Sequence, residues 1–321
     1  MDGIGVVLAG GGSKGAYQIG VWKALIELDV IKNVGAYSGT SIGALNAGLF
    51  VQGDIDRAEH LWLSITREKL MTKKISEHLE MTRLTQRLKD FKININFENL
   101  SIIEKVKSLG KDFDLQNANL ISKFKNFPHQ SPNVDLSLLS ERIKNINLHG
   151  IYSREGIKQM MIESADFTYI GNSDIHWFAA CLEIPNFKIK YFKLNKLDND
   201  EIEKILLASS AIPIVYDPVI IKSKTYVDGG ASRLGDNVPV KPIYDLGYKK
   251  IIVVHLRHNS IIDERLFPGV KILQIRPTQD IGNFLSGIVD FSVEGVKRRI
   301  ECGYNDTMRL KQQFIELDFI D

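Results

Sequence analysis

The sequence predicts an α/β fold in which helices cover a mainly parallel sheet. Short runs rich in Val and Ile, each the length of a strand, alternate with helix-length segments whose apolar residues recur every three or four positions. Glycine-containing turns join the first two strands to the helices that follow them. Hydrophobic residues make up 44% of the 321 residues and charged residues 25%. This composition is that of an ordinary globular protein and excludes a disordered chain, a collagen-like chain and a coiled-coil rod.

The first third of the chain alternates strand, helix, strand and helix. This order is typical of a parallel sheet covered by helices. The first helix is expected to place Ile19, Trp22, Leu25 and Ile26 on one face. The expected elements are strands at 4–9 and 34–38 and helices at 16–28, 42–51 and 54–64.

The composition changes between about residues 67 and 150. Glycine becomes scarce, and 15 Lys or Arg residues stand against 10 Asp or Glu residues, a local net charge of +5. Segments 70–88 and 100–109 are expected to be helical, and 127–134 is expected to be a loop. We interpret 67–150 as a helical cap inserted in the α/β domain. The cap is either a solvated surface or a lid that faces anionic lipid headgroups.

The α/β pattern returns after the insertion. We therefore expect one domain over 1–321, with a helical C-terminal segment at 281–321. The expected elements are helices at 154–163 and 202–210, strands at 177–182, 188–194, 220–227, 250–256 and 270–275, and a mostly helical stretch at 284–314.

Charge and cysteine content exclude several classes of function. Lys and Arg number 41 and Asp and Glu number 39, so the formal net charge of +2 gives no reason to expect a nucleic-acid binder. Cys181 and Cys302 are far apart and form neither a disulfide framework nor a cysteine zinc site. No HExxH motif or other cluster of metal ligands occurs, so no metal is expected.

The sequence contains no candidate for membrane insertion or export. The longest apolar runs have the length of a strand, whereas a spanning helix needs about 18 apolar residues. The N-terminus carries Asp2, has no basic region and leads directly into a strand, so no signal peptide is expected. We expect a cytoplasmic protein, and export by a route that reads no N-terminal signal is compatible with the sequence.

The segment Gly39-Thr40-Ser41-Ile42-Gly43 fits G-x-S-x-G and lies between a predicted strand and a predicted helix. This is the context of a nucleophile elbow, in which a tight turn exposes the serine hydroxyl at the carboxyl end of the sheet. Glycines two positions on either side remove side chains that would collide with neighbouring elements. The free N–H groups of the following helix favour negative charge near Ser41.

The segment 10–15 reads GGGSKG and also lies between a strand and a helix. Consecutive glycines leave backbone N–H groups free to bind an anion. The anion is either the oxyanion of an ester under attack or a dinucleotide pyrophosphate, because the segment also satisfies G-x-G-x-x-G. A dinucleotide site needs an acidic residue at the end of the second strand, and Asp29 precedes that strand, so the sequence favours the oxyanion. Lys14 does not make a Walker A loop, because no Ser or Thr follows it.

The segment 228–230 reads DGG and follows a predicted strand. A carboxylate at a strand end can act as a base for a serine, although Asp-Gly is also a common turn. His255 and His258 follow Asp228 in the order of a Ser-Asp-His triad. His255 lies in an apolar strand and His258 just beyond it, so we interpret both as structural residues.

In combination, GGGSKG at 10–15, GTSIG at 39–43 and DGG at 228–230 resemble the three motifs of the patatin-like phospholipase family. The resemblance covers about residues 1–66 and 151–255. Supporting resemblances are an Ala-Ser-x-Ala-x-Pro block at 208–213, an Asn-x-Pro segment at 237–239 and the start of the helix beyond a variable cap at 151–153.

The resemblance implies a three-layer α/β/α fold and a Ser-Asp dyad. Ser41 corresponds to the nucleophile and Asp228 to its base. The amides of Gly10, Gly11 and Gly12, mainly the last two, correspond to the oxyanion hole. The remaining motif residues are Gly39 and Gly43 of the elbow and the supporting residues Lys14, Gly15, Gly229 and Gly230.

The resemblance further implies hydrolysis of acyl esters of lipids, of the phospholipase A or lysophospholipase type, without metal or other cofactor. The basic cap at 67–150 then suggests transient contact with a membrane surface. Many relatives have Ala where this chain has Gly230, a difference that we expect to be harmless. The alternatives are a catalytically silent lipid-binding protein and, with less support, a dinucleotide-binding enzyme.

Overall fold

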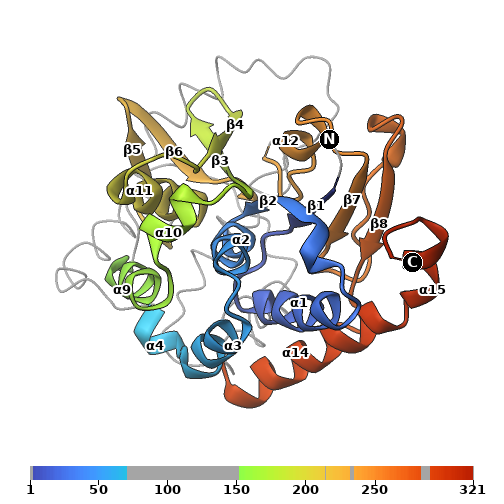
Figure 1. Cartoon of the computed structure of the whole chain (residues 1–321). Helices are drawn as coiled ribbons and strands as arrows, with labels where there is room; N and C mark the ends of the chain where they lie inside the picture. The colour runs from blue at the N-terminus through green and yellow to red at the C-terminus, as the bar shows by residue number, and fades with distance from the viewer. Residues whose placement is uncertain (1–2, 71–151, 214, 232–234, 283–289, 321) are drawn as a thin grey trace, which may run out of the picture.

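In a computed structural model, residues 3–70, 152–213, 215–231, 235–282 and 290–320 are described, and all structural statements below concern these residues. They form a mixed eight-stranded sheet covered by helices (Figure 1). The strands are β1 Ile4–Leu8, β2 Val34–Thr40, β3 His176–Ile184, β4 Lys188–Lys193, β5 Val219–Ile221, β6 Lys224–Asp228, β7 Lys250–Val254 and β8 Lys271–Ile275.

The helices follow the expected order along the described chain, and several begin at a side chain that caps them. Asp54, Asp198 and Ser292 each accept a hydrogen bond from the backbone N–H three residues later, which satisfies an N–H group that has no partner within the helix. The helices are η1 Gly12–Gly15, α1 Ala16–Glu27, η2 Ile31–Asn33, α2 Ile42–Gln52, α3 Ile55–Ser64, α4 Arg67–Leu70, α9 Glu155–Ser164, α10 Phe167–Asn172, α11 Asn199–Ser209, α12 Lys241–Asp245, η3 Glu264–Leu266, α14 Val293–Met308 and α15 Lys311–Glu316.

The strands run in the order β5-β6-β3-β2-β1-β7-β8, and β4 also pairs with β3. The pairs within β3-β2-β1-β7-β8 are parallel, whereas β4 and β6 pair with β3, and β5 with β6, in antiparallel fashion. The sheet therefore has a parallel half, as expected, and an antiparallel half built around β3.

The central strands are buried on both faces, which confirms the three-layer arrangement. Along β1, Val6 and Leu8 contribute to one hydrophobic cluster and Val7 to another. The larger cluster lies toward α1, α2 and α11, and the smaller one toward α12 and the connection between β7 and β8. Buried central strands of a parallel sheet have this continuous apolar character.

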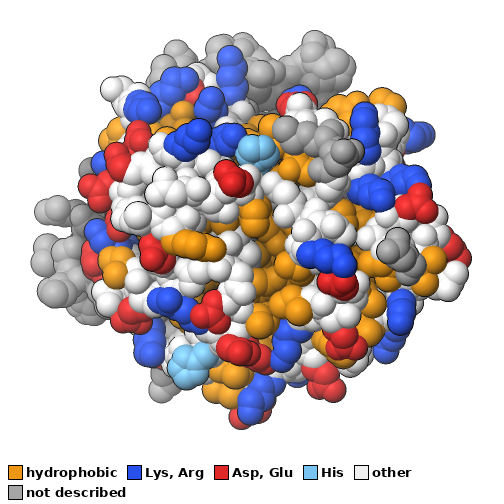
Figure 2. Space-filling view, in the orientation of Figure 1, with side chains coloured by type: hydrophobic (Ala, Val, Ile, Leu, Met, Phe, Trp, Pro, Cys, Tyr) orange, Lys and Arg blue, Asp and Glu red, His pale blue; other side chains and the backbone are white. Residues whose placement is uncertain are grey.

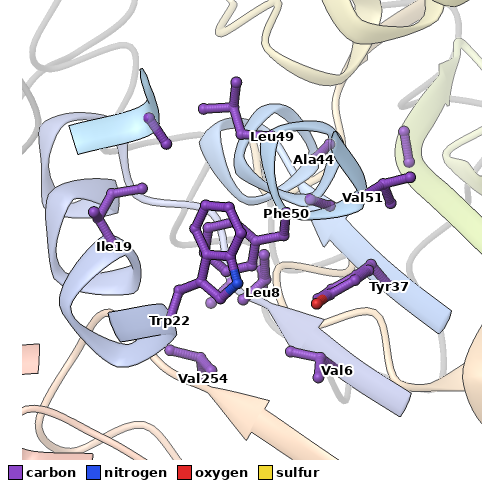
Figure 3. Packing of buried hydrophobic residues seen from close by; sticks show 14 of the residues in the cluster. Val6, Leu8, Ile19, Trp22, Tyr37, Ala44, Leu49, Phe50, Val51 and Val254 are labelled. Carbon is purple, nitrogen blue, oxygen red and sulfur yellow. The ribbon is translucent and has the colours of Figure 1, made fainter. Parts of the chain in front are cut away.

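The two helices that follow the glycine turns pack against each other through aromatic rings. Trp22 of α1 stacks on Phe50 of α2 with ring centroids 4.2 Å apart, and Tyr37 of β2 meets the same Phe50 ring edge-on (Figure 3). Leu8 at the end of β1 lies beside this stack. The packing fixes α1 and α2 relative to the strand ends from which they start.

Two predictions are wrong. Ile26, expected on the apolar face of the first helix, is 41% exposed, whereas Ile19, Trp22 and Leu25 are buried. The stretch 220–227, expected to be a single strand, is a hairpin of β5 and β6 with its turn at Lys222 and Ser223. Both turn residues have positive φ, 46° and 66°, which is uncommon for residues other than Gly, Asn and Asp. The turn thus lacks the residues by which a hairpin is recognised in a sequence.

The expected cap helices and loop at 70–150 lie outside the described residues, apart from Leu70 at the end of α4. The C-terminal segment is helical over α14 and α15, and α14 packs along α1 (Figure 1). Among the described helices, none is both long enough and apolar enough to cross a membrane.

Candidate active site

Ser41 and Asp228 come together because two strands end at neighbouring positions along β3. β2 pairs with β3 as far as Thr40 beside Ala180, and β6 ends with Asp228 beside Cys181. β4 runs alongside both of these β3 residues, so β2 and β6 lie end to end along the opposite edge of β3. Consecutive residues of a strand are about 3.3 Å apart. Ser41, which follows Thr40, therefore lies next to the end of β6.

The turn at Ser41 has the conformation and the steric surroundings of a nucleophile elbow. Ser41 has φ 56° and ψ −125°, a backbone state that costs of order 1–3 kcal/mol and persists only where the surroundings impose it. A Cβ on Gly39 would lie 2.3 Å from the carbonyl carbon of Gly43, and a Cβ on Gly43 would lie 2.2 Å from the Leu8 oxygen. Both glycines are required by close backbone contacts, and the expected strand-turn-helix context is present.

The glycine loop at 10–12 lies directly against this elbow. A Cβ on Gly10 would lie 3.3 Å from the Cβ of Ser41. The Gly10 N–H donates to the Asn237 carbonyl oxygen at 3.1 Å, so it is already engaged. Gly12 has φ 58°, in the left-handed region that favours glycine. Gly11 and Gly12 are thus the loop residues whose amides are candidates for binding an anion beside the serine.

Asp228 is buried and held by backbone groups. Its own N–H donates to the Ala211 carbonyl oxygen at 2.9 Å, and its Oδ1 accepts a hydrogen bond from the Gly230 N–H at 2.7 Å. A Cβ on Gly229 would lie 2.6 Å from the Ala180 oxygen, so the turn after the aspartate packs tightly on β3. The DGG turn therefore orients the carboxylate at the strand junction.

The end of α11 and the residues that follow it hold both Ser41 and Asp228. Ser209 accepts a hydrogen bond from the Ser41 N–H at 2.9 Å and donates its own hydroxyl to the Ala180 oxygen at 2.8 Å. Two residues later, Ala211 accepts from the Asp228 N–H. The sequence identified this block only as a supporting resemblance. The sequence feature that could have indicated this role is a serine at the end of a helix whose inward-facing residues are otherwise apolar.

Asn237 connects the glycine loop with the aspartate turn. Its Nδ2 donates to the Gly10 oxygen at 3.2 Å, and its Oδ1 lies 2.3 Å from where a Cβ on Gly230 would be. Ser38 of β2 anchors the same segment by donating to the Pro239 oxygen at 2.8 Å. An alanine at 230 would therefore displace the Asn237 side chain, so the glycine in this chain leaves room for Asn237 beside the aspartate turn.

A second carboxylate, the half-buried Asp236, lies beside the site and connects neighbouring segments by hydrogen bonds. Its Oδ2 accepts from the Tyr191 hydroxyl at 2.6 Å, its Oδ1 accepts from the Val238 N–H at 3.1 Å, and its carbonyl accepts from the Thr40 hydroxyl at 2.7 Å. Burial raises the pKa of Asp236, although the hydrogen bonds from Tyr191 and Val238 oppose this shift.

Lys14 and Gly15 support the loop from its other side. A Cβ on Gly15 would lie 2.5 Å from the Ile42 side chain, so this glycine allows η1 to pack on the start of α2. Lys14 is 6% exposed, and burial together with the nearby charge of Arg257 lowers its pKa to about 8, while Asp280 opposes the shift. Arg257 follows β7 and Asp280 follows β8, and Arg299 of α14 also contributes to lowering this pKa.

His255, one of the two histidines that follow Asp228 in the chain, is held by hydrogen bonds away from the role of a base. His255 is buried, with Nδ1 3.0 Å from the Ser260 hydroxyl and Nε2 2.9 Å from Gln274 Oε1, so both ring nitrogens are engaged. Burial also raises the pKa of the Cys181 thiol beside Asp228, which keeps it protonated and unreactive. Within the described ranges, no group of three or more His, Cys, Asp or Glu residues is arranged to hold a metal ion.

Two solved structures resemble this chain. VipD from Legionella pneumophila has 15% identity and a TM-score of 0.44, with 98% of this chain and 67% of that one covered. The type III effector protein ExoU has 16% identity and a TM-score of 0.41, with 97% of this chain covered. This chain spans about half the length of ExoU, 53%. No curated protein matches the chain.

A family model, in contrast, matches most of the chain. It describes patatin-like phospholipases and matches residues 6–244, a range that contains the glycine loop, the serine elbow and the aspartate turn. By this match, the chain belongs to the patatin-like phospholipase family of lipid acyl hydrolases.

Proposed function

We propose that this protein hydrolyses fatty-acyl esters of lipids, as a phospholipase A or lysophospholipase, with Ser41 as nucleophile and Asp228 as its base. The observation that supports the proposal is the strand junction on β3. The elbow serine after β2 and the aspartate at the end of β6 meet there, and the glycine loop after β1 lies against the serine.

In the first half of the reaction, the Ser41 hydroxyl oxygen attacks the acyl carbonyl carbon while Asp228 accepts the hydroxyl proton. The carbonyl oxygen becomes an oxyanion, which the N–H groups of Gly11 and Gly12 and the start of α2 at Ile42 stabilise. The Ser41 N–H is engaged with Ser209 and does not contribute. The ester C–O bond then breaks, and the alcohol leaves with the proton from Asp228.

In the second half, a water molecule gives a proton to Asp228 and attacks the acyl-serine ester. The second oxyanion is stabilised by the same amides. When it collapses, the fatty acid leaves and the proton returns to Ser41. No step requires a metal or an organic cofactor.

The test is labelling of the purified protein with a fluorophosphonate, read as intact mass, with Ser41→Ala alongside. We expect one adduct in the wild type and none in the variant, because the reagent reports an activated serine without requiring the natural substrate. An adduct that persists in Ser41→Ala would contradict the proposal. Vesicle binding in the absence of any adduct would instead favour a catalytically silent lipid-binding protein.

A further inference from the structure

The strand β4 exposes lysines on both of its faces, Lys188 and Lys190 on one and Lys193 on the other. Among the described strands, β4 pairs with β3 alone, so it forms an edge of the antiparallel half of the sheet. Four lysines occur within the nine residues 188–196, and no Asp or Glu occurs between Glu183 and Asp198. We use the name lysine edge for three residues of β4 that are all exposed: Lys188, Lys190 and Lys193. Figure 2 shows Lys and Arg side chains gathered over the part of the molecule where Figure 1 places β4 and the β5–β6 hairpin.

The acid that faces the lysine edge across the pairing of β3 with β4 is Glu183, which lies directly opposite Lys188 and forms its ion pair with Lys224. The two lysines of the neighbouring hairpin are paired, Lys222 with Glu201 at 3.2 Å and Lys224 with Glu183 at 2.8 Å. In the part of the chain that the structure describes, by contrast, no lysine of the lysine edge forms an ion pair. Three solvated ammonium groups therefore remain available to an anionic partner.

The lysine edge lies close to the candidate active site. Lys190 is directly opposite Cys181, and Cys181 is directly opposite Asp228, so the three residues form one row across β4, β3 and β6. Neighbouring strands are about 4.8 Å apart, which places the backbones of Lys190 and Asp228 roughly 10 Å from each other. A membrane surface bound by these lysines would therefore lie about as far from the candidate active site as the length of one lipid headgroup.

Apolar and aromatic side chains accompany the lysines. Ile189 lies between Lys188 and Lys190, and Tyr191 and Phe192 lie between Lys190 and Lys193. The Lys190 ammonium lies 5.9 Å from the centre of the Phe192 ring. Ile220 on β5 is 69% exposed. Long basic side chains that extend over apolar surface, together with an exposed aliphatic residue, fit the interface between lipid headgroups and acyl chains.

We propose that the lysine edge is the surface by which this protein docks on an anionic bilayer, with the three ammonium groups on lipid phosphate or carboxylate groups. The proposal rests on the proposed function in one respect only: the lipid is taken to be the source of the substrate. The near-neutral total charge and the exposed Ile220 favour a bilayer over a nucleic acid.

The test is sedimentation of the full chain with vesicles of phosphatidylcholine alone or with one fifth phosphatidylserine. We expect binding only to the anionic vesicles and weaker binding as salt is raised. Each lysine is expected to contribute roughly fivefold in affinity, so Lys188→Gln/Lys190→Gln/Lys193→Gln should bind on the order of 100-fold more weakly. The same substitutions to Arg should preserve binding, because they keep the charge.

A matched control removes the same charge from the helices at the other end of the molecule. Lys297 and Arg298 of α14 and Lys311 of α15 are exposed, and their triple Gln variant should bind anionic vesicles as the wild type does. Equal losses in the two triple variants would contradict a specific surface, and so would equal binding by the β4 variant and the wild type. The proposal would also be overturned if the lysine edge bound a short oligonucleotide more tightly than anionic vesicles. It would likewise be overturned if the β4 variant self-associated and kept its binding to vesicles.

Vesicle binding can be measured in a Ser41→Ala background, so it does not depend on catalysis. If labelling at Ser41 fails while anionic binding persists in the wild type and is lost in the β4 variant, the docking surface stands and the proposed dyad does not. Conversely, the β4 variant should hydrolyse a soluble short-chain ester at the wild-type rate, because its lysines lie outside the proposed catalytic groups.

Discussion

Ser41 and Asp228 lie at the junction where β2 and β6 end along β3, but different interactions fix their positions. The elbow at Ser41 is built locally, from a strand, a strained turn and a helix within 19 consecutive residues, Val34–Thr40 to Ile42–Gln52. Asp228 depends on distant pairing, because its position is set by the register of β6 on β3 and by the Ala211 carbonyl. One half of the proposed dyad is therefore encoded in a short motif and the other half in the assembly of the sheet.

Substitutions at the two turns should differ in their effect on stability and activity, because the two turns are surrounded by different kinds of atoms. Around Ser41 the close contacts are between backbone atoms, which have little room to move. Around Asp228 one of the closest contacts is with the side chain of Asn237, which can rotate. Changes at the elbow should therefore be severe. At the aspartate turn the cost should depend on the position, severe at Gly229, which faces the Ala180 backbone, and smaller at Gly230, which faces the Asn237 side chain.

Asp228→Asn should have the largest effect on activity. The amide keeps an oxygen for the Gly230 N–H, so the turn should be retained, but it cannot accept the Ser41 proton. We expect kcat to fall on the order of 10⁴-fold with little change in thermal stability. Because groups that act as a unit are not additive, the double variant with Ser41→Ala should be no slower than Ser41→Ala alone. A fall of less than tenfold would contradict Asp228 as the base.

Gly43→Ala should have the largest effect on folding. Its Cβ would lie 2.2 Å from the Leu8 oxygen, a contact that only a backbone shift can relieve, so we expect a loss of about 3 kcal/mol or more in unfolding free energy. Gly53→Ala is the control, because Gly53 ends the same helix with φ 83° and no atom lies near its Cβ position. That variant should lose only about 1–2 kcal/mol from its left-handed conformation. Urea unfolding measures both, and equal losses would contradict the steric argument.

Ser209→Ala should separate positioning from stability. It leaves the Ser41 N–H without its partner, which costs about 1–3 kcal/mol. Because it loosens the strained turn, we also expect kcat to fall by roughly 10- to 100-fold at unchanged KM, the size of effect expected when a reacting group is misplaced by about 1 Å. Ser210→Ala is the control, since the Ser210 hydroxyl bonds only within α11 and its turn, to Leu206 and Leu207. If both variants lose kcat equally, Ser209 has no specific role at the elbow.

The features that could be predicted from the sequence are the local ones, and the features that could not are those that depend on contacts between distant residues. The parallel strands, their helices and the elbow at Ser41 depend on local patterns, and the structure has them where expected. The roles of Ser209 and Asn237 could not be predicted, because their hydrogen bonds join residues 168 and 227 positions apart. The β5–β6 hairpin was missed because Lys222 and Ser223 form its turn without glycine or asparagine.

Gly230→Ala should have the smallest effect of these substitutions. It tests directly whether a side-chain contact in the aspartate turn can be relieved by rotation. The new Cβ would lie 2.3 Å from Asn237 Oδ1, so the Asn237 side chain must turn away and give up its hydrogen bond to the Gly10 oxygen. We expect a loss of about 1 kcal/mol in unfolding free energy and a fall in kcat of a few fold, because the glycine loop loses one of its ties.

A double-mutant cycle with Asn237→Ala isolates this contact. Once the Asn237 side chain is removed, no clash with residue 230 remains and the bond to Gly10 is already lost. Gly230→Ala should then add almost nothing to either effect, so the two substitutions should be clearly non-additive. Additive losses would mean that the alanine acts on Asp228 directly, whose Oδ1 lies 3.3 Å from the same Cβ position, and that the aspartate turn is as rigid as the elbow.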